Sequence, residues 1–291
     1  MRYFYYPGCS LKGTGRSYEE SLLAVFKALG VATTELPQWN CCGATAYMSV
    51  NELEAFALAA RNLALAANGG EGEPTCIIAP CNACYLALVK AQRYLRDDPA
   101  VGKSVRDALA ESGLTYDDRI LVRHPLDVLV NDVGVKALEA KARRPLEGLT
   151  IACYYGCQIV RPYAKFDDEY NPMSMDAILR SLGAETIDWP LKSRCCGASL
   201  TGTVERAGLA LSHILLTEAR KRGADVVATC CPLCQFNLEC YQGRMRQRFQ
   251  DDVRMPVAYF TQLIGMALGL ETEALGLQRT MAPAVPAPAA S

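Results

Sequence analysis

The sequence predicts an α/β protein made of two tandem, duplicated halves, each a small, mostly parallel sheet with flanking helices. Three observations carry this prediction. Cysteine-bearing segments of the first half return in the same order in the second, short apolar runs alternate with amphipathic helical stretches, and the cysteines stand where strands end and helices begin. This alternation is typical of parallel α/β units, which bind ligands at the carboxyl ends of their strands.

The elements follow one order in both halves. In the first half, the predicted strands and helices are a strand at 3–6, a helix at 17–29, a helix at 51–67, a strand at 76–78, a helix at 84–95 and a strand-to-helix stretch at 122–129. In the second half they are a strand starting at 150–152, a helix at 204–220, a strand at 226–228 and a strand-to-helix stretch at 257–264. Gly30 stops the first helix, because glycine readily adopts the left-handed conformation that ends helices.

Three segments carry the repeat. YYPGC at 5–9 returns as YYGC at 154–157, CCGA at 41–44 as CCGA at 195–198, and APCNACY at 79–85 as CCPLCQ at 230–235. Cys9 precedes Cys41 by 32 positions and Cys157 precedes Cys195 by 38, so the spacings agree to within a loop. We therefore expect one domain at 1–145 and a second at 146–275, followed by an Ala- and Pro-rich tail at 276–291 that is disordered.

Composition excludes several classes of protein. Hydrophobic residues make up 51% and charged residues 21%, as in ordinary globular chains. Thirty Lys and Arg against 31 Asp and Glu leave a net charge of −1, which argues against a nucleic-acid binder. No stretch is apolar for the roughly 20 residues that a membrane span needs, and the amino terminus lacks an export signal. We therefore predict a cytoplasmic protein without a membrane span.

Fourteen cysteines in 291 residues are the unusual feature, and a reducing compartment directs them to metal or redox chemistry. Each half supplies a single cysteine, an adjacent pair and a C-x-x-C. The candidate ligands are Cys9, Cys41, Cys42, Cys81 and Cys84 in the first half, and Cys157, Cys195, Cys196, Cys231 and Cys234 in the second. Five cysteines repeated in register are a far stronger signal than one C-x-x-C.

Iron–sulfur clusters are the favoured interpretation of this set, with structural zinc and thiol redox chemistry as alternatives. A zinc site uses four ligands and would leave one cysteine of each half idle. Two adjacent side chains diverge and bind two different metal atoms more easily than one, which favours a polynuclear centre. An ordinary cubane cluster takes four cysteines, so five point to an unusual geometry.

The remaining candidates have simpler interpretations. Cys76, Cys153, Cys230 and Cys240 fall outside the repeated register and are expected to be small buried hydrophobes, although Cys153 could substitute for Cys157. His124 is the better proton donor of the two histidines, but a structural role is the simpler interpretation for it and for His213. No nucleotide-binding motif is present, so a flavin or nicotinamide would reside in a partner.

The spacing Cys, Cys-Cys-Gly, C-x-x-C, present twice over residues 1–270, resembles the cysteine-rich CCG domain pair in the B subunit of heterodisulfide reductase and its bacterial relatives. Both triplets, Cys41-Cys42-Gly43 and Cys195-Cys196-Gly197, are intact. The resemblance implies one noncubane 4Fe–4S cluster in each domain, held by the ten cysteines of the repeat.

The resemblance also implies an activity and partners. It implies an oxidoreductase subunit that reduces or oxidises a disulfide or sulfur substrate, such as the heterodisulfide of coenzyme B and coenzyme M or its counterpart in bacterial sulfur metabolism. The partners would be a ferredoxin-like iron–sulfur subunit of the C type and a flavoprotein subunit of the A type. The alternatives are an electron-relay or docking subunit, such as the cysteine-rich subunit of a succinate or fumarate reductase, and a structural zinc module.

Overall fold

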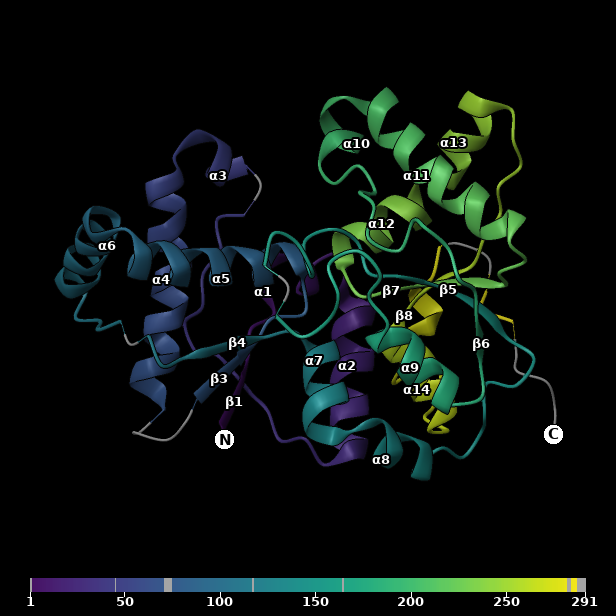
Figure 1. Ribbon diagram of the computed structural model, residues 1–291, viewed down its shortest axis with the longest axis horizontal. Coiled ribbons are helices and arrows are strands. Elements are labelled where there is room, and N and C mark those ends of the chain that lie inside the picture. Colours follow the sequence, from purple (N-terminus) through teal and green to yellow (C-terminus); the bar gives the residue numbers. More distant parts are fainter. Residues whose placement is uncertain are drawn as a thin grey trace. The chain divides into compact units, whose positions relative to one another are not determined.

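The computed structural model describes residues 2–44, 46–70, 75–116, 118–163, 165–281 and 284–286. Within them the chain forms two four-stranded parallel sheets with helices around them (Figure 1). Both sheets have the same strand order, β2-β1-β3-β4 and β6-β5-β7-β8. The α/β class and the parallel sheets with flanking helices are therefore confirmed.

The first sheet consists of β1 (Arg2–Tyr5), β2 (Thr34–Glu35), β3 (Thr75–Ile78) and β4 (Leu121–Arg123). The second consists of β5 (Thr150–Tyr154), β6 (Glu185–Thr186), β7 (Val226–Thr229) and β8 (Val257–Tyr259). The central strands pair Tyr5 with Ile78 and Tyr154 with Thr229. Strands β3 and β7 are buried along their whole length, which explains why both read as short apolar runs.

Contacts divide the chain into two compact units. One comprises Met1–Cys9 and Ala32–Pro125, and the other comprises Ser10–Val31 and Leu126–Ser291. The first unit contains α3 (Ala46–Val50), α4 (Glu52–Gly69), α5 (Asn82–Asp97) and α6 (Pro99–Glu111), and the short α1 (Gly8–Leu11) crosses the division. The boundary expected near residue 145 concerns the sequence repeat, and it stays a prediction.

The second unit contains α2 (Arg16–Leu29), all but the first residue of α7 (Pro125–Val128), the π-helix η1 (Leu129–Val133), α8 (Val135–Ala140), α9 (Ser174–Ser181), α10 (Leu200–Thr203), α11 (Glu205–Lys221), α12 (Pro232–Cys240), α13 (Gln242–Phe249), α14 (Phe260–Ala267) and the 3-10 helix η2 (Leu277–Arg279). Helix α2 packs on the end of the second sheet. The Tyr18 ring stacks on Tyr259 with centroids 4.4 Å apart, and the hydroxyls of Ser21 and Thr261 lie 2.7 Å apart.

The tail expected to be disordered begins with ordered residues. Helix η2 places the Arg279 guanidinium 2.9 Å from the Glu20 carboxylate of α2. Residues 282–283 and 287–291 lie outside the described residues, so disorder of the tail stays a prediction for them.

Candidate metal centres

Parallel strands bring the cysteines of each half to one edge of its sheet. Cys9 follows β1 and Cys81 follows β3, where Cys81 is the residue that caps α5. In the second half, Cys157 follows β5 and Cys231 caps α12 in the same way. Because the carboxyl ends of parallel strands meet at one edge, residues far apart in the sequence become neighbours there.

In the first half all five cysteines of the repeat come together. The Sγ atoms of Cys42 and Cys84 lie 3.2 Å apart. The Cys41 thiol contacts that of Cys42, and the Cys81 thiol contacts that of Cys84. Cys9 lies close enough to Cys41 to act on it electrostatically. The structure therefore gathers the five thiols at one place.

The second half repeats this arrangement. The Sγ atoms of Cys196 and Cys234 lie 3.5 Å apart, and the Cys231 thiol contacts that of Cys234. Cys157 contacts Cys195 and lies within electrostatic range of Cys196 and Cys231. The second cysteine of the adjacent pair thus meets the second cysteine of C-x-x-C in both halves. The role of these ten residues as ligands stays a prediction.

The environment favours thiolates at three of the four cysteines in the adjacent pairs, Cys42, Cys195 and Cys196. Hydrogen bonding to Cys41 and Cys84 lowers the pKa of Cys42 to about 4. In the second half, hydrogen bonding to Cys157 lowers the pKa of Cys195 to about 6, and hydrogen bonding to Cys234 lowers the pKa of Cys196. Thiolate is the form that binds metals, so the lowered pKa values favour metal binding at these three thiols.

The Cys-Cys-Gly-Ala turn supplies backbone donors to these thiolates. The Gly197 N–H points at Cys195 Sγ across 3.3 Å, and the Ala198 N–H points at Cys196 Sγ across 3.5 Å. In the first half the Ala44 N–H likewise helps to lower the pKa of Cys42, whereas hydrogen bonding to Cys42 and burial raise the pKa of Cys41 despite the Gly43 N–H. A hydrogen bond to a charged acceptor stabilises the charged form, so the turn favours thiolate at Cys42, Cys195 and Cys196.

Glycine is required at the third position of this turn for two reasons. Gly43 has φ +74° and Gly197 has φ +101°, a region that other residues rarely adopt. A Cβ atom on Gly197 would also lie 2.9 Å from the Gly208 backbone of α11, and one on Gly43 would lie 3.1 Å from the Ala55 backbone of α4. The turn is thus pressed against a helix in each half.

We expect Gly197→Ala to lower the thermal midpoint, because the strained φ alone costs about 1–3 kcal/mol and the clash is with backbone. The matched control is Gly202→Ala in the neighbouring helix α10, where a Cβ would meet nothing within 4 Å. Differential scanning calorimetry of both variants measures the effect. An equal change in the two midpoints would contradict the proposed constraint.

Tyrosines of the repeated YYPGC and YYGC segments hold the cysteine-bearing loops. The Tyr6 hydroxyl donates to the Asn40 carbonyl across 2.8 Å, and the Tyr154 hydroxyl donates to the Arg194 carbonyl across 2.6 Å. Each tyrosine therefore anchors the residue that precedes the adjacent cysteines. Burial raises the pKa of both phenols, so they stay protonated and remain donors.

Buried asparagines perform a related task from the helices. In α12 the Asn237 amide donates to Cys196 Sγ across 3.4 Å and to the Ala198 carbonyl across 2.9 Å. In α4 the Asn62 side chain accepts from the Asn40 N–H across 3.0 Å and donates to the Asn40 carbonyl across 3.1 Å. These amides fix the adjacent-cysteine loop of each half from the helix side.

The second half also contains a buried ion pair behind its loops. Lys192 and Asp176 are 1% and 0% exposed, and Lys192 Nζ lies 3.0 Å from Asp176 Oδ1. The Tyr155 hydroxyl donates to the other oxygen of Asp176 across 2.7 Å. The Lys192 carbonyl accepts from the N–H groups of Tyr155 and Gly156, at 2.9 and 3.1 Å. The pair therefore joins the loop that carries Cys157 to the loop that carries Cys195.

The structure separates Cys153 from the other thiols of its half. Cys153 is fully buried in β5, and burial and the Asp176 carboxylate raise the pKa of its thiol. Cys230 is also fully buried, with its thiol 3.3 Å from the Tyr155 carbonyl, and Cys76 is fully buried in β3. Cys240 is half-buried, and burial raises the pKa of its thiol to about 11.

Both histidines make contacts that stabilise the fold. His124 is fully buried, with ring nitrogen Nε2 3.0 Å from the Pro80 carbonyl, next to Cys81. His213 lies 3.0 Å from Asp251 and stacks on Phe249 with centroids 4.4 Å apart. Catalysis by His124 stays an untested hypothesis.

No group of three or more His, Cys, Asp or Glu side chains within 2–44, 46–70, 75–116, 118–163, 165–281 and 284–286 is arranged to hold a metal ion as it stands. Nor does any helix within these residues combine the length and the apolar composition that a membrane crossing requires.

Comparison with known families agrees with the repeated thiol arrangement. Residues 3–89 and 151–239 each match the cysteine-rich domain CCG. The chain belongs to the CCG cysteine-rich domain family. The two CCG domains match the two segments in which the five cysteines converge, so the resemblance predicted from the cysteine spacing is confirmed.

Curated relatives cover almost the whole chain. The 8-methylmenaquinol:fumarate reductase membrane anchor subunit of Wolinella succinogenes is 31% identical over 279 residues, covering 95% of each chain. The B subunit of the Ferredoxin/F(420)H(2)-dependent CoB-CoM heterodisulfide reductase of Methanosarcina acetivorans is 28% identical over 282 residues, covering 94% of this chain and 91% of that one. A protein of Archaeoglobus profundus, named as similar to the heterodisulfide reductase B subunit, is 29% identical over 280 residues, covering 94% of this chain and 92% of that one. The chain is thus a homologue of the B subunit of heterodisulfide reductase.

A solved structure shares the fold. The crystal structure of a hypothetical protein from Helicobacter pylori superposes with a TM-score of 0.74 over 97% of this CCG chain, at 17% identity. The chain spans about half, 52%, of the length of that protein. At this identity the likeness concerns the fold alone.

Proposed function

We propose that this chain holds two 4Fe–4S clusters of the noncubane type, one in each CCG domain, on the ten cysteines of the repeat. The main observation in support is that five thiols converge in each half with the same pairing, Cys42 with Cys84 and Cys196 with Cys234. The two CCG domains and the heterodisulfide reductase relatives support iron–sulfur clusters as the bound groups.

The donor set suits a polynuclear centre. All five donors in each half are sulfur, which selects iron–sulfur clusters or zinc among biological metals. Four thiolates would satisfy a zinc ion and leave a fifth over. The location of Cys153, fully buried beside Asp176, supports Cys157 as the fifth ligand of the second half.

The chain then acts as the iron–sulfur subunit of a complex of the heterodisulfide reductase type. Such a complex reduces a disulfide with two electrons and two protons to give two thiols, or runs the reaction in reverse. Bound clusters would supply the one-electron transfers at the thiolate sites. We place the complex in the cytoplasm, with a ferredoxin-like C-type subunit and a flavoprotein A-type subunit as partners, and its substrate is a disulfide or sulfur compound.

In each half some of the cysteine thiols are shielded from water and others are open to a substrate or an electron partner. Cys42, Cys84, Cys196 and Cys234 are 3–7% exposed, so water is excluded from the inner thiols. Cys9 and Cys41 are exposed, and Cys157 and Cys195 are partly exposed. Each half therefore presents one open side, at the single cysteine and the first cysteine of the adjacent pair, where a substrate sulfur or an electron partner could approach.

A second candidate function is electron relay to a membrane-bound partner. The observation that favours it is the 31% identity to the membrane anchor subunit of a fumarate reductase. In that function the clusters would pass electrons onward without contacting a sulfur substrate. The two functions require the same ligands and differ in whether a disulfide reacts at a cluster.

Metal analysis of anaerobically purified protein tests the proposal. We expect about eight irons and eight acid-labile sulfides per chain, as two 4Fe–4S clusters require. Addition of a disulfide to the reduced protein should then generate a new paramagnetic signal if the clusters meet the substrate. Iron and sulfide without that signal would favour the relay function, and zinc without sulfide would overturn the cluster assignment.

A further inference from the structure

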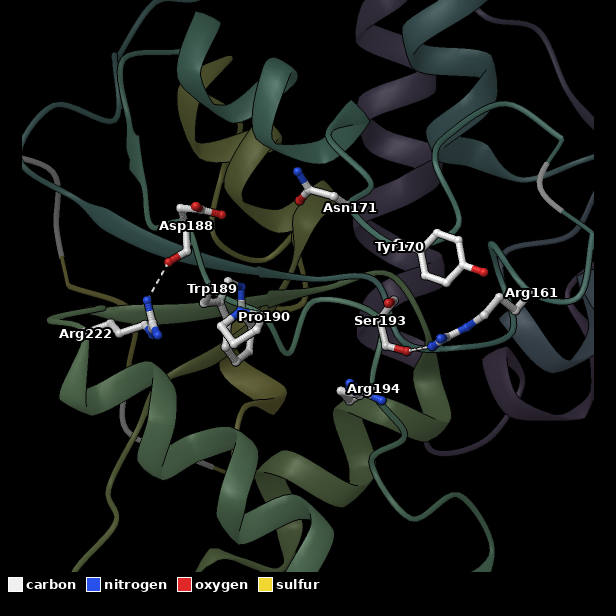
Figure 2. A pocket seen from close by; sticks show the side chains of 9 residues that line it. All are labelled: Arg161, Tyr170, Asn171, Asp188, Trp189, Pro190, Ser193, Arg194 and Arg222. Carbon is white, nitrogen blue, oxygen red and sulfur yellow. Dashed lines mark hydrogen bonds between the residues drawn. The ribbon is translucent and has the colours of Figure 1, made fainter.

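A pocket of about 580 Å³ lies against the loop that precedes Cys195 (Figure 2). Trp189, Ser193 and Arg194 of this loop line one side, and Arg222 at the end of α11 closes another. The pocket lies wholly within the second compact unit, and its lining contains none of the candidate ligand cysteines. It is therefore a separate feature beside the second set of thiols.

A loop that is longer in the second half builds the remaining wall. The helix after Cys9 starts at Arg16, whereas the helix after Cys157 starts only at Ser174. The extra residues contribute Arg161, Tyr170 and Asn171 to the pocket.

Hydrogen bonds hold this wall in place. Asp168 Oδ1 accepts the N–H groups of Tyr170 and Asn171, at 2.8 and 2.7 Å. Asp167 accepts the N–H groups of Met173 and Ser174, each at 2.9 Å. The backbone at the tip of the loop is therefore held by two carboxylates.

The lining carries a positive charge, from three arginines against the single carboxylate of Asp188. The Arg222 guanidinium already has protein partners, because its Nε lies 2.6 Å from Glu218 and its Nη1 donates to the Asp188 carbonyl across 2.9 Å. Arg161 donates one N–H to the Ser193 carbonyl, which leaves its other donors available (Figure 2). Arg194 has no acceptor for its guanidinium among the described residues.

Apolar surface stands beside these donors. Trp189 is 3% exposed and its indole N–H already donates to the Cys153 carbonyl across 3.1 Å, so it presents ring carbon to the pocket. Pro190 and the Tyr170 ring add to this surface. Guanidinium groups bind carboxylates, and apolar walls bind apolar groups. A pocket with both therefore suits a ligand that has a carboxylate and an apolar body.

The first half differs at the position that corresponds to Arg194. There Asn40 precedes the adjacent cysteines, and its side chain is held by the Arg61 guanidinium at 2.9 Å and donates to the Leu58 carbonyl across 3.0 Å. Both halves gather five thiols, yet the first places a hydrogen-bonded asparagine before them and the second an arginine with free donors. An arginine at this position is therefore not needed to gather the thiols.

We infer that this pocket binds a small organic carboxylate, with the anionic group at Arg194 and Arg161 and the apolar body against Trp189. Where the proposed function holds, the ligand is the anionic end of the disulfide or thiol substrate. Only this second statement rests on the proposed function, since binding of a carboxylate requires no cluster.

Isothermal titration of the anaerobically purified full chain tests the inference with three probes. Dithiodiglycolate carries two carboxylates on a disulfide, adipate has the same chain length without sulfur, and hydroxyethyl disulfide is neutral. We expect saturable binding of the two carboxylates and none of the neutral disulfide. Arg194→Gln should weaken the binding by about tenfold or more, because a hydrogen bond to a charged group is lost.

Arg248→Gln is the matched control, since Arg248 is an exposed arginine of the same unit that does not line the pocket. Equal weakening by both variants, or failure of both carboxylates to bind the unmodified chain, would overturn the inference. Adipate separates the two proposals. If the chain contains zinc but binds adipate through Arg194, only the cluster proposal is contradicted. If it contains eight irons but binds no carboxylate, only the pocket inference is contradicted.

Discussion

Cys196→Ser is expected to halve the iron content of the purified chain, from about eight to about four atoms. Cys196 lies at the centre of its thiol group, 3.5 Å from Cys234 Sγ, and accepts hydrogen bonds from the Ala198 N–H and the Asn237 amide. A serine hydroxyl is a poor ligand for iron at neutral pH, because it stays protonated and is harder than thiolate. Iron, sulfide and the visible absorption spectrum measure the loss.

Two further variants make this experiment specific. Cys42→Ser should remove the other half of the iron, because Cys42 occupies the same position 3.2 Å from Cys84. Cys153→Ser is the control, since Cys153 is fully buried in the same half but points to Asp176. Full iron content in Cys196→Ser, or a loss in Cys153→Ser as large as in Cys196→Ser, would contradict the ligand assignment.

Much of the fold follows from local sequence pattern. Apolar runs at 76–78 and 226–228 are the central strands β3 and β7, and the helical stretch at 17–29 is α2 (Arg16–Leu29). The strand order is not visible in such patterns, since it depends on which edge of a strand each crossover reaches. Nor does an amphipathic face show which surface it packs on, so the stacking of Tyr18 on Tyr259 does not follow from local sequence pattern.

For the candidate metal centres too, the sequence predicts some residues and not others. The ten cysteines stand out in the sequence because a duplication places each one twice in the same register, and the structure brings each group of five together. Two of the residues that hold the loops, Asn237 and Lys192, carry no such signal. Asn237 reads as an ordinary helix residue and Lys192 as a surface charge, because lysine is almost never buried without a partner. Only the fold reveals that Asp176 supplies that partner.

Asp176→Asn is expected to destabilise the chain by about 3–5 kcal/mol, because it leaves the Lys192 ammonium buried without a counter-charge. The substitution keeps the size of the side chain and an oxygen for the Tyr155 hydroxyl, so the charge is the main change. The thermal midpoint should fall by on the order of 5–15 °C for a protein of this size. Asp107→Asn is the control, since its pair with Lys103 is 60–78% exposed and solvent screening leaves such a pair little effect on stability.

A second substitution separates lost charge pairing from general disruption. Adding Lys192→Met to Asp176→Asn removes the orphaned ammonium, so most of the lost stability should return. Because the Lys192 carbonyl holds the N–H groups of Tyr155 and Gly156, the single variant should also lose iron from the second half faster than from the first. A double variant no more stable than the single one would mean that the carboxylate acts through its hydrogen bonds alone. Equal iron loss from both halves would mean that the ion pair does not hold the Cys157 loop in place.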